Sequence, residues 1–163
     1  MNINDALKIM NEKADEYAAR FTETGVTVKK EVRYLNRVFA EIQNPKRARY
    51  MTVTLTLCAD GLEEEYEYCL SIGAELHRSG VNESQLEKAK AEFAFFANAA
   101  LDRLRGSDNP TEVLYKLSSE ANEEHEKLLA ELSQMQRKWH KRAGLFSLIA
   151  IIVMIILIVI LSL

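Results

Sequence analysis

The sequence predicts a mainly α-helical cytosolic domain followed by one C-terminal transmembrane helix, and it admits a small antiparallel β unit within residues 26–58. Three observations lead to this fold class. Apolar residues recur every three or four positions over most of the chain, which is typical of amphipathic helices. Residues 50–58 instead alternate between threonine and apolar residues, which is typical of a half-buried strand. The final stretch, 144–163, is almost wholly apolar.

Residues 144–163 predict where the protein resides. This segment has no charged residue, and from Leu145 onwards only Ser147 and Ser162 are polar. As a helix, residues 145–163 would be about 28 Å long, which matches the roughly 30 Å of a bilayer's hydrocarbon core. A lone span must satisfy its own backbone hydrogen bonds, so we expect a single membrane-spanning helix that anchors the protein in a lipid bilayer.

The residues just before this segment predict its orientation. Basic residues flanking a span stay on the cytoplasmic side, so we expect a cytoplasmic N-terminal domain and a C-terminus across the membrane. Residues 1–17 contain acids and no apolar core of a signal peptide. This layout resembles that of tail-anchored proteins, a resemblance that covers only the end of the chain. The expected membrane-interface residues are Arg137, Lys138, Trp139, Lys141 and Arg142.

Apolar periodicity predicts helices at residues 4–22, 61–78, 83–105 and 110–163. We expect the helix at 83–105 to be the buried centre of the domain, because residues 92–101 are apolar nearly all round. The helix at 110–163 is expected to run uninterrupted into the membrane. The predicted N-terminal caps are Asn4 or Asp5, Asp60, Asn82 and Asn109, and the predicted buried stripe of the helix at 61–78 is Leu62, Tyr66, Cys69, Gly73 and Leu76.

Residues 26–58 have two interpretations, which depend on each other. Val28, Val32 and Leu35 follow helical spacing, which favours a helix, but the stretches 26–28 and 38–42 could also be strands. A strand at 50–58 needs a partner, and 26–43 is the neighbour available. The segment is therefore either a β unit or a helical hairpin. The threonines at 52, 54 and 56 favour a strand at 50–58, because threonine is costly inside a helix.

These segments predict three parts: a cytosolic helical domain at 1–109, a juxtamembrane amphipathic helix at 110–143 and a transmembrane anchor at 144–163. Cys58 and Cys69 match no zinc-ligand spacing, and we interpret both as small core residues. His77, His125 and His140 belong to no recognisable catalytic motif. We therefore expect no enzymatic activity, no cofactor and no metal site.

Two groups of residues are candidates for binding a protein partner or a second copy of the chain. One is the apolar stripe of the helix at 110–143, which could pair with a second copy as a short coiled coil, bind a different protein, or instead pack back on the domain. The other is a basic stretch that could instead pair with the domain's own acidic residues, contact anionic lipid, or bind nucleic acid, the last being the least expected. The candidate partner-binding residues are Leu117, Leu128 and Leu132 on the stripe, and Lys29, Lys30, Arg33, Arg37, Lys46, Arg47 and Arg49 in the basic stretch.

The function predicted from these features is that of a tail-anchored, single-pass membrane protein whose cytosolic domain binds a partner as an adaptor, regulator or assembly component. One alternative is a membrane-active effector, such as a holin-like or immune pore-forming protein. The anchor contains no charge and no GxxxG motif, which favours a plain tether over a pore lining. A second alternative is a membrane-tethered enzyme whose site has no recognisable motif.

Overall fold

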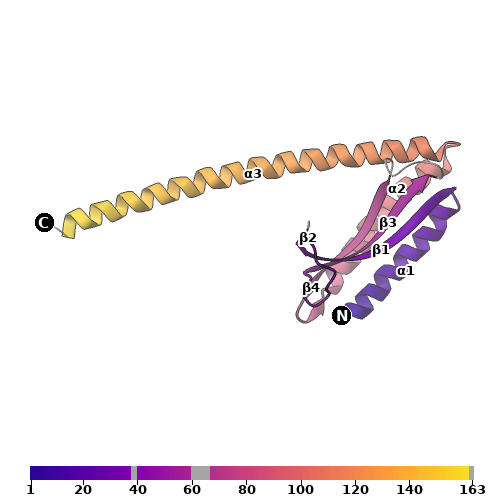
Figure 1. Cartoon of the computed structure of the whole chain (residues 1–163), viewed down its shortest axis with the longest axis horizontal. Coiled ribbons are helices and arrows are strands. Elements are labelled where there is room, and N and C mark those ends of the chain that lie inside the picture. The colour runs from indigo at the N-terminus through magenta and orange to yellow at the C-terminus, as the bar shows by residue number, and fades with distance from the viewer. Residues whose placement is uncertain (38–39, 60–66, 162–163) are drawn as a thin grey trace. The chain divides into compact units, whose positions relative to one another are not determined.

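The computed structural model describes the backbone of residues 1–37, 40–59 and 67–161, and the side chains of residues 1–36, 41–59 and 67–135. The chain divides into two compact units, Met1–Ser119 and Glu120–Leu163. The first unit is mixed α/β (Figure 1), so the predicted combination of helices and an antiparallel β unit is confirmed in part, but the sheet is larger than a mainly helical domain would contain. The second unit consists, where the structure describes it, of the continuation of one helix.

The first unit is built around an antiparallel sheet whose strand order is β2-β1-β3-β4-β5. Strands β1, β3 and β4 form a meander, in which each strand pairs with the next along almost its whole length. Two short strands extend this meander at its margins. The elements are α1 (Ile3–Thr22), β1 (Val26–Arg37), β2 (Ala40–Glu41), β3 (Tyr50–Ala59), β4 (Tyr68–His77), β5 (Gly80–Val81), α2 (Glu83–Arg105) and α3 (Pro110–Leu161).

The alternation in β3 confirms the strand predicted at 50–58 and decides between the two interpretations of 26–58. Thr52, Thr54 and Thr56 lie on one face of β3 and are only partly buried. On the other face, every second residue from Met51 to Ala59 is buried. Strand β1 pairs with β3 from Val26 to Leu35, so the expected partner strand is present. The sequence admitted a small β unit, and the structure shows a larger one.

The helix predicted at 61–78 is wrong over the part that the structure describes, because Tyr68–His77 is strand β4. Its buried residues alternate with exposed or half-buried ones, and Cys69 is exposed. The spacing of Cys69, Gly73 and Leu76 fits a helix only by coincidence. The proposed cap at Asp60 and the stripe residues Leu62 and Tyr66 lie outside the described residues. The buried residues of β4 are Leu70, Ile72, Ala74 and Leu76.

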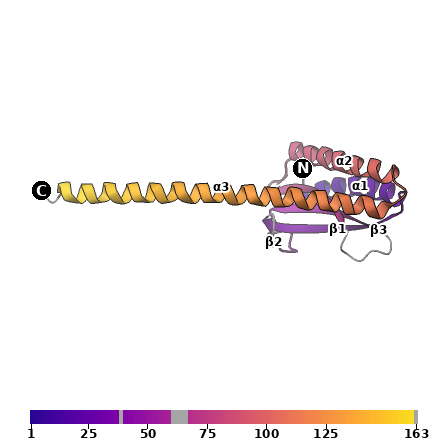
Figure 2. The same cartoon turned by 90° about the horizontal axis from the view of Figure 1, so that it is seen from above.

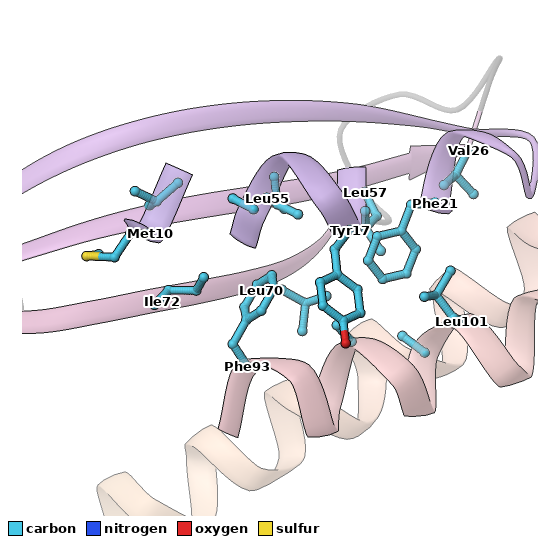
Figure 3. Packing of buried hydrophobic residues seen from close by; sticks show 14 of the residues in the cluster. Met10, Tyr17, Phe21, Val26, Leu55, Leu57, Leu70, Ile72, Phe93 and Leu101 are labelled. Carbon is cyan, nitrogen blue, oxygen red and sulfur yellow. The ribbon is translucent and has the colours of Figure 1, made fainter. Parts of the chain in front are cut away.

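Helices α1 and α2 lie on the same side of the sheet (Figure 2), and α1 packs against β1 and β3 while α2 packs against β4. Their apolar stripes and the inward rows of the strands form one core (Figure 3). The first helix buries Ala6, Met10, Ala14, Tyr17 and Phe21, which follow one another at steps of three or four residues. Burying a large apolar side chain such as Met10 or Phe21 stabilises a fold by about 1.5–3 kcal/mol. The core therefore lies between one face of the sheet and helices α1 and α2, and Leu114 and Leu117 at the start of α3 add to it.

Helix α2 has the predicted bounds and the predicted cap, because the Asn82 side chain accepts hydrogen bonds from the backbone N–H groups of Ser84 and Gln85. It is not the buried centre of the domain, however. Phe93 is 2% exposed, whereas Phe95 and Phe96 are 70% and 51% exposed. Residues two apart on a helix point in nearly opposite directions, so a helix on one face of a sheet cannot bury all three rings.

The N-terminal cap of helix α1 is Asn2, whose side chain accepts a hydrogen bond from the backbone N–H of Asp5. The predicted caps, Asn4 or Asp5, are therefore wrong, and the helix begins earlier than they allow. Helix α3 begins at Pro110, and Asn109 Oδ1 accepts a hydrogen bond from the N–H of Glu112 at 3.4 Å, as predicted. The compact unit continues into this helix as far as Ser119.

Among the helical residues whose side chains the structure describes, no stretch is long and apolar enough to cross a membrane. The predicted anchor at 144–163 lies outside these residues, as do the side chains of the predicted interface residues Arg137, Lys138, Trp139, Lys141 and Arg142.

Candidate interaction surfaces

The sheet of the first unit has one face that α1 and α2 cover and one polar face. The polar face carries the three threonines of β3, with Ser71 beside Thr54 at a distance of 2.8 Å between their hydroxyl oxygens. Lys29, Glu31 and Arg33 lie on the same face, because their register partners on β3 are Thr56, Thr54 and Thr52. The face is therefore a polar surface bordered by charges of both signs.

The basic residues of β1 are largely paired within the domain. Lys29 Nζ lies 3.8 Å from Glu67 Oε1, and Lys30 Nζ lies 2.6 Å from Asp15 Oδ1 on α1. Arg33 donates hydrogen bonds from Nε and Nη2 to Glu31 Oε2. Hydrogen bonding to Glu31, and then the charge of its carboxylate, raise the pKa of Arg33. These three cations therefore have acidic partners of their own, although the pairs are partly exposed. The side chain of Arg37 lies outside the described residues.

The other three basic candidates form a cluster at residues 46–49, which we call the basic loop. Lys46, Arg47 and Arg49 are exposed, and none has a carboxylate within 4.0 Å in the part of the chain whose side chains are described. The sequence did not separate these residues from the paired ones on β1. The structure divides the basic stretch into a paired half and a half whose cations face solvent.

Backbone hydrogen bonds hold the basic loop in place at one end of the sheet. Asn44 Oδ1 accepts a bond from the N–H of Lys46 at 3.0 Å, and Asn44 O accepts one from Arg47 at 3.1 Å, which closes a turn around Pro45. The N–H of Arg49 donates to Leu35 O at 2.8 Å, and Arg49 O accepts from Leu76 at 2.6 Å. The loop is thus tied to β1 and β4, so its cations are presented from a fixed backbone.

The three leucines of the predicted partner stripe occupy different environments. Leu117 is 7% exposed and belongs to the core of the first unit. Leu128 and Leu132 are 53% and 38% exposed on the second unit. Sequence reasoning did not single out Phe95, Phe96, Tyr115 or Leu129, which are also exposed. The signal for Phe95 and Phe96 was available, because three phenylalanines within four residues of a helix cannot share one face.

The two cysteines are not core residues, contrary to prediction. Cys69 is exposed and Cys58 is half-buried on the polar face of the sheet. Burial, and then a hydrogen bond from the Cys58 thiol to Glu67 Oε1 at 3.5 Å, raise the pKa of Cys58. A raised pKa disfavours the thiolate, which is the nucleophilic form.

The histidines of the described region are also on the surface. His77 Nε2 lies 3.7 Å from Glu75 Oε2, and His125 is exposed on α3. Within the described side chains, no three His, Cys, Asp or Glu residues are grouped so that they could hold a metal ion. The position of the His140 side chain lies outside these residues.

No protein-family model matches the sequence, and no curated protein or solved structure matches it significantly.

Proposed function

We propose that this chain is a single-pass membrane protein whose α/β unit is held at the cytoplasmic surface of a bilayer, where it acts by binding a protein partner. The observation that carries the proposal is the uncharged segment 145–163, which directly follows four cations at 137–142. A segment of this length and composition spans a bilayer, and basic residues beside it remain cytoplasmic. The α/β unit precedes the cations and would remain on their side.

The basic loop is the part of the α/β unit that we assign to the partner. Its three cations have no acidic partner among the described side chains, whereas Lys29, Lys30 and Arg33 on β1 do. Oppositely charged surfaces accelerate encounter and select partners by charge. We therefore infer that the partner presents an acidic segment. Because the loop backbone is tied to two strands, binding would not need to order it first, which favours affinity.

The proposal can be tested with the full-length protein in cells. The loop variant K46E/R47E/R49E should remain in the membrane fraction but lose crosslinks to its partner. The matched control K8E/K88E/K116E makes the same change in net charge at helix surfaces, where each lysine has an acidic neighbour in the i,i+4 position. The control should keep the crosslinks. Equal crosslinking by the two variants would refute the role of the loop, and wild-type protein in the soluble fraction would refute the anchor.

A further inference from the structure

Helix α3 presents an apolar stripe to solvent in the second unit. Every residue from Glu120 to Met135 is exposed. Within this stretch four large apolar side chains lie close together: Leu128 (53% exposed), Leu129 (45%), Leu132 (38%) and Met135 (50%). An exposed apolar stripe of this kind marks an interaction site.

The spacing of this stripe is that of a coiled coil. His125, Leu128, Leu132 and Met135 are separated by three, four and three residues, so they occupy successive a and d positions of a heptad repeat. Ala121 occupies the preceding d position. Leu129 lies at an e position and widens the apolar strip. One polar residue at an a position, here His125, is a feature that fixes register in coiled coils at some cost in stability.

We propose that residues 121–135 pair with the same residues of a second copy of this chain in a parallel, in-register coiled coil. This inference rests on the proposed function, because anchors inserted with one orientation bring two copies together with their α3 helices pointing the same way. The pairing would bury the four apolar side chains, and it would set the two His125 side chains in one layer.

The charges beside the stripe favour the parallel arrangement. Glu124 and Glu131 occupy the g positions. In a parallel pair each g residue faces an e residue of the other helix, and the e positions hold Leu129 and, in the sequence, Gln136, both uncharged. In an antiparallel pair g residues face g residues, so the glutamates would oppose each other. Like charges so placed are destabilising.

The proposed coiled coil is short, so we expect it to form in the membrane and not in dilute solution. About two heptads contribute little stability in dilute solution, but confinement to a membrane raises the effective concentration of one copy near another. We therefore expect pairing in the bilayer at protein densities at which dissolved chains would be monomeric. Replacing His125 by Leu should strengthen the pairing, because it exchanges a polar layer for an apolar one.

Disulfide trapping of full-length protein in membranes tests the arrangement. The background C58S/C69S removes both native cysteines. On it, L128C should give a disulfide-linked dimer on mild oxidation, because a d residue faces its own copy in a parallel pair. The control A130C lies at the outward f position and should give several-fold less dimer. Adding H125L should increase the L128C dimer.

Three results would overturn the inference. The L128C variant could give no more dimer than A130C. Alternatively, L128C could crosslink to L132C in mixed samples but not to itself, which would indicate antiparallel helices. Adding L132S to L128C could also leave dimer formation unchanged, which would mean that the stripe does not hold the pair.

Alkaline carbonate extraction of the same samples separates this inference from the proposed anchor. A chain that is extracted has no membrane anchor, and the proposed function fails. In that extracted protein, an L128C dimer in excess of the A130C dimer would still support parallel pairing, whereas its absence would overturn the membrane-dependent pairing together with the anchor. A chain that resists extraction but gives no L128C dimer keeps the anchor and loses the pairing.

Discussion

Lys30 Nζ lies 2.6 Å from Asp15 Oδ1, which joins strand β1 to helix α1 across the side of the sheet that the helices cover. Lys30 faces that side because its register partner is the buried Leu55. Its row on β1 otherwise consists of Val26, Val28, Val32 and Tyr34. A lysine is accommodated there because its apolar stem can lie along the core margin while its ammonium group reaches the carboxylate.

This pair should contribute modestly to stability. The two side chains are 34% and 60% exposed, and partly exposed ion pairs have coupling energies of about 0.2–1 kcal/mol. A double-mutant cycle with K30A and D15A, measured by urea unfolding, should give a value in this range that decreases in high salt. The more exposed Lys8–Glu12 pair, with nitrogen and oxygen 3.9 Å apart, is the control and should couple more weakly. A larger coupling for the control would contradict this interpretation.

The two sides of α2 should respond differently to truncation. Phe93 is 2% exposed and packs edge-on against Tyr17, with ring centroids 5.4 Å apart. Phe93→Ala should lower the unfolding free energy by about 3–5 kcal/mol, because it leaves a cavity. Phe95→Ala removes a ring that is 70% exposed and should change it by less than about 0.5 kcal/mol. Thermal melts of both variants provide the comparison, and equal effects would show that α2 is buried on both sides.

The raised pKa of Cys58 makes a prediction about thiol reactivity. In the C69S variant, alkylation of Cys58 in the native protein should accelerate at a higher pH than in the same protein unfolded in urea. Burial is the main cause of the shift and the Glu67 hydrogen bond the second. Glu67→Gln should therefore move the native profile part of the way back. Coincident native and unfolded profiles would show that the thiol is not perturbed.

The same shift predicts how stability depends on pH. Since the pKa of Cys58 is higher in the folded than in the unfolded state, the unfolded chain loses the thiol proton first as pH rises. The stability that the environment of the Cys58 thiol contributes is fully present below the pKa of the thiol in the unfolded chain. It is lost as pH rises through the pKa of the thiol in the folded protein. Urea unfolding of the C69S and C58S/C69S variants across this alkaline range should show the extra decline only where Cys58 is present.

Two glycines with positive φ angles should differ in their tolerance of alanine. Gly25, between α1 and β1, has φ of 81° and open space where a Cβ would lie. Gly25→Ala should cost about 1–2 kcal/mol, from backbone strain alone. Gly80, with φ of 117°, lies against the backbone of Met1, so an added Cβ would collide with the carbonyl oxygen of that residue. Gly80→Ala should therefore lower the melting temperature further than Gly25→Ala, and the reverse order would contradict the observed docking of the chain start on β5.

The sequence predicted elements correctly where one periodicity prevailed. Helices α1 and α2 and the start of α3 at Pro110 follow from regular apolar spacing and caps, and β3 follows from its alternating threonines. Strand β4 was missed because Cys69, Gly73 and Leu76 happen to follow helical spacing. The strand conformation of β4 depends on its pairing with β3, a separate segment of the chain. A single segment's pattern cannot report such a tertiary pairing.

The candidate site residues show a similar division. The sequence identified the basic stretch but could not tell that Lys30 pairs with Asp15 while the basic loop lacks acidic neighbours among the described side chains. It also placed Leu117 and Leu128 on one stripe. Leu117 is buried in the core of the first unit, whereas Leu128 is exposed on the second unit. Burial depends on what packs against a helix, which periodicity alone does not contain.

Protease protection of the full-length chain tests the central claim, membrane anchoring by residues 144–163, most directly. An epitope would be placed after Leu163, and protease added to the cytoplasmic side of sealed membranes. We expect digestion of the α/β unit and survival of a short protected fragment that carries the epitope. The control Ile156→Arg places a charge near the midplane at a cost of about 2.5–3.5 kcal/mol, and it should reduce the protected fragment. Loss of the epitope together with the α/β unit in the unmodified protein would contradict the account.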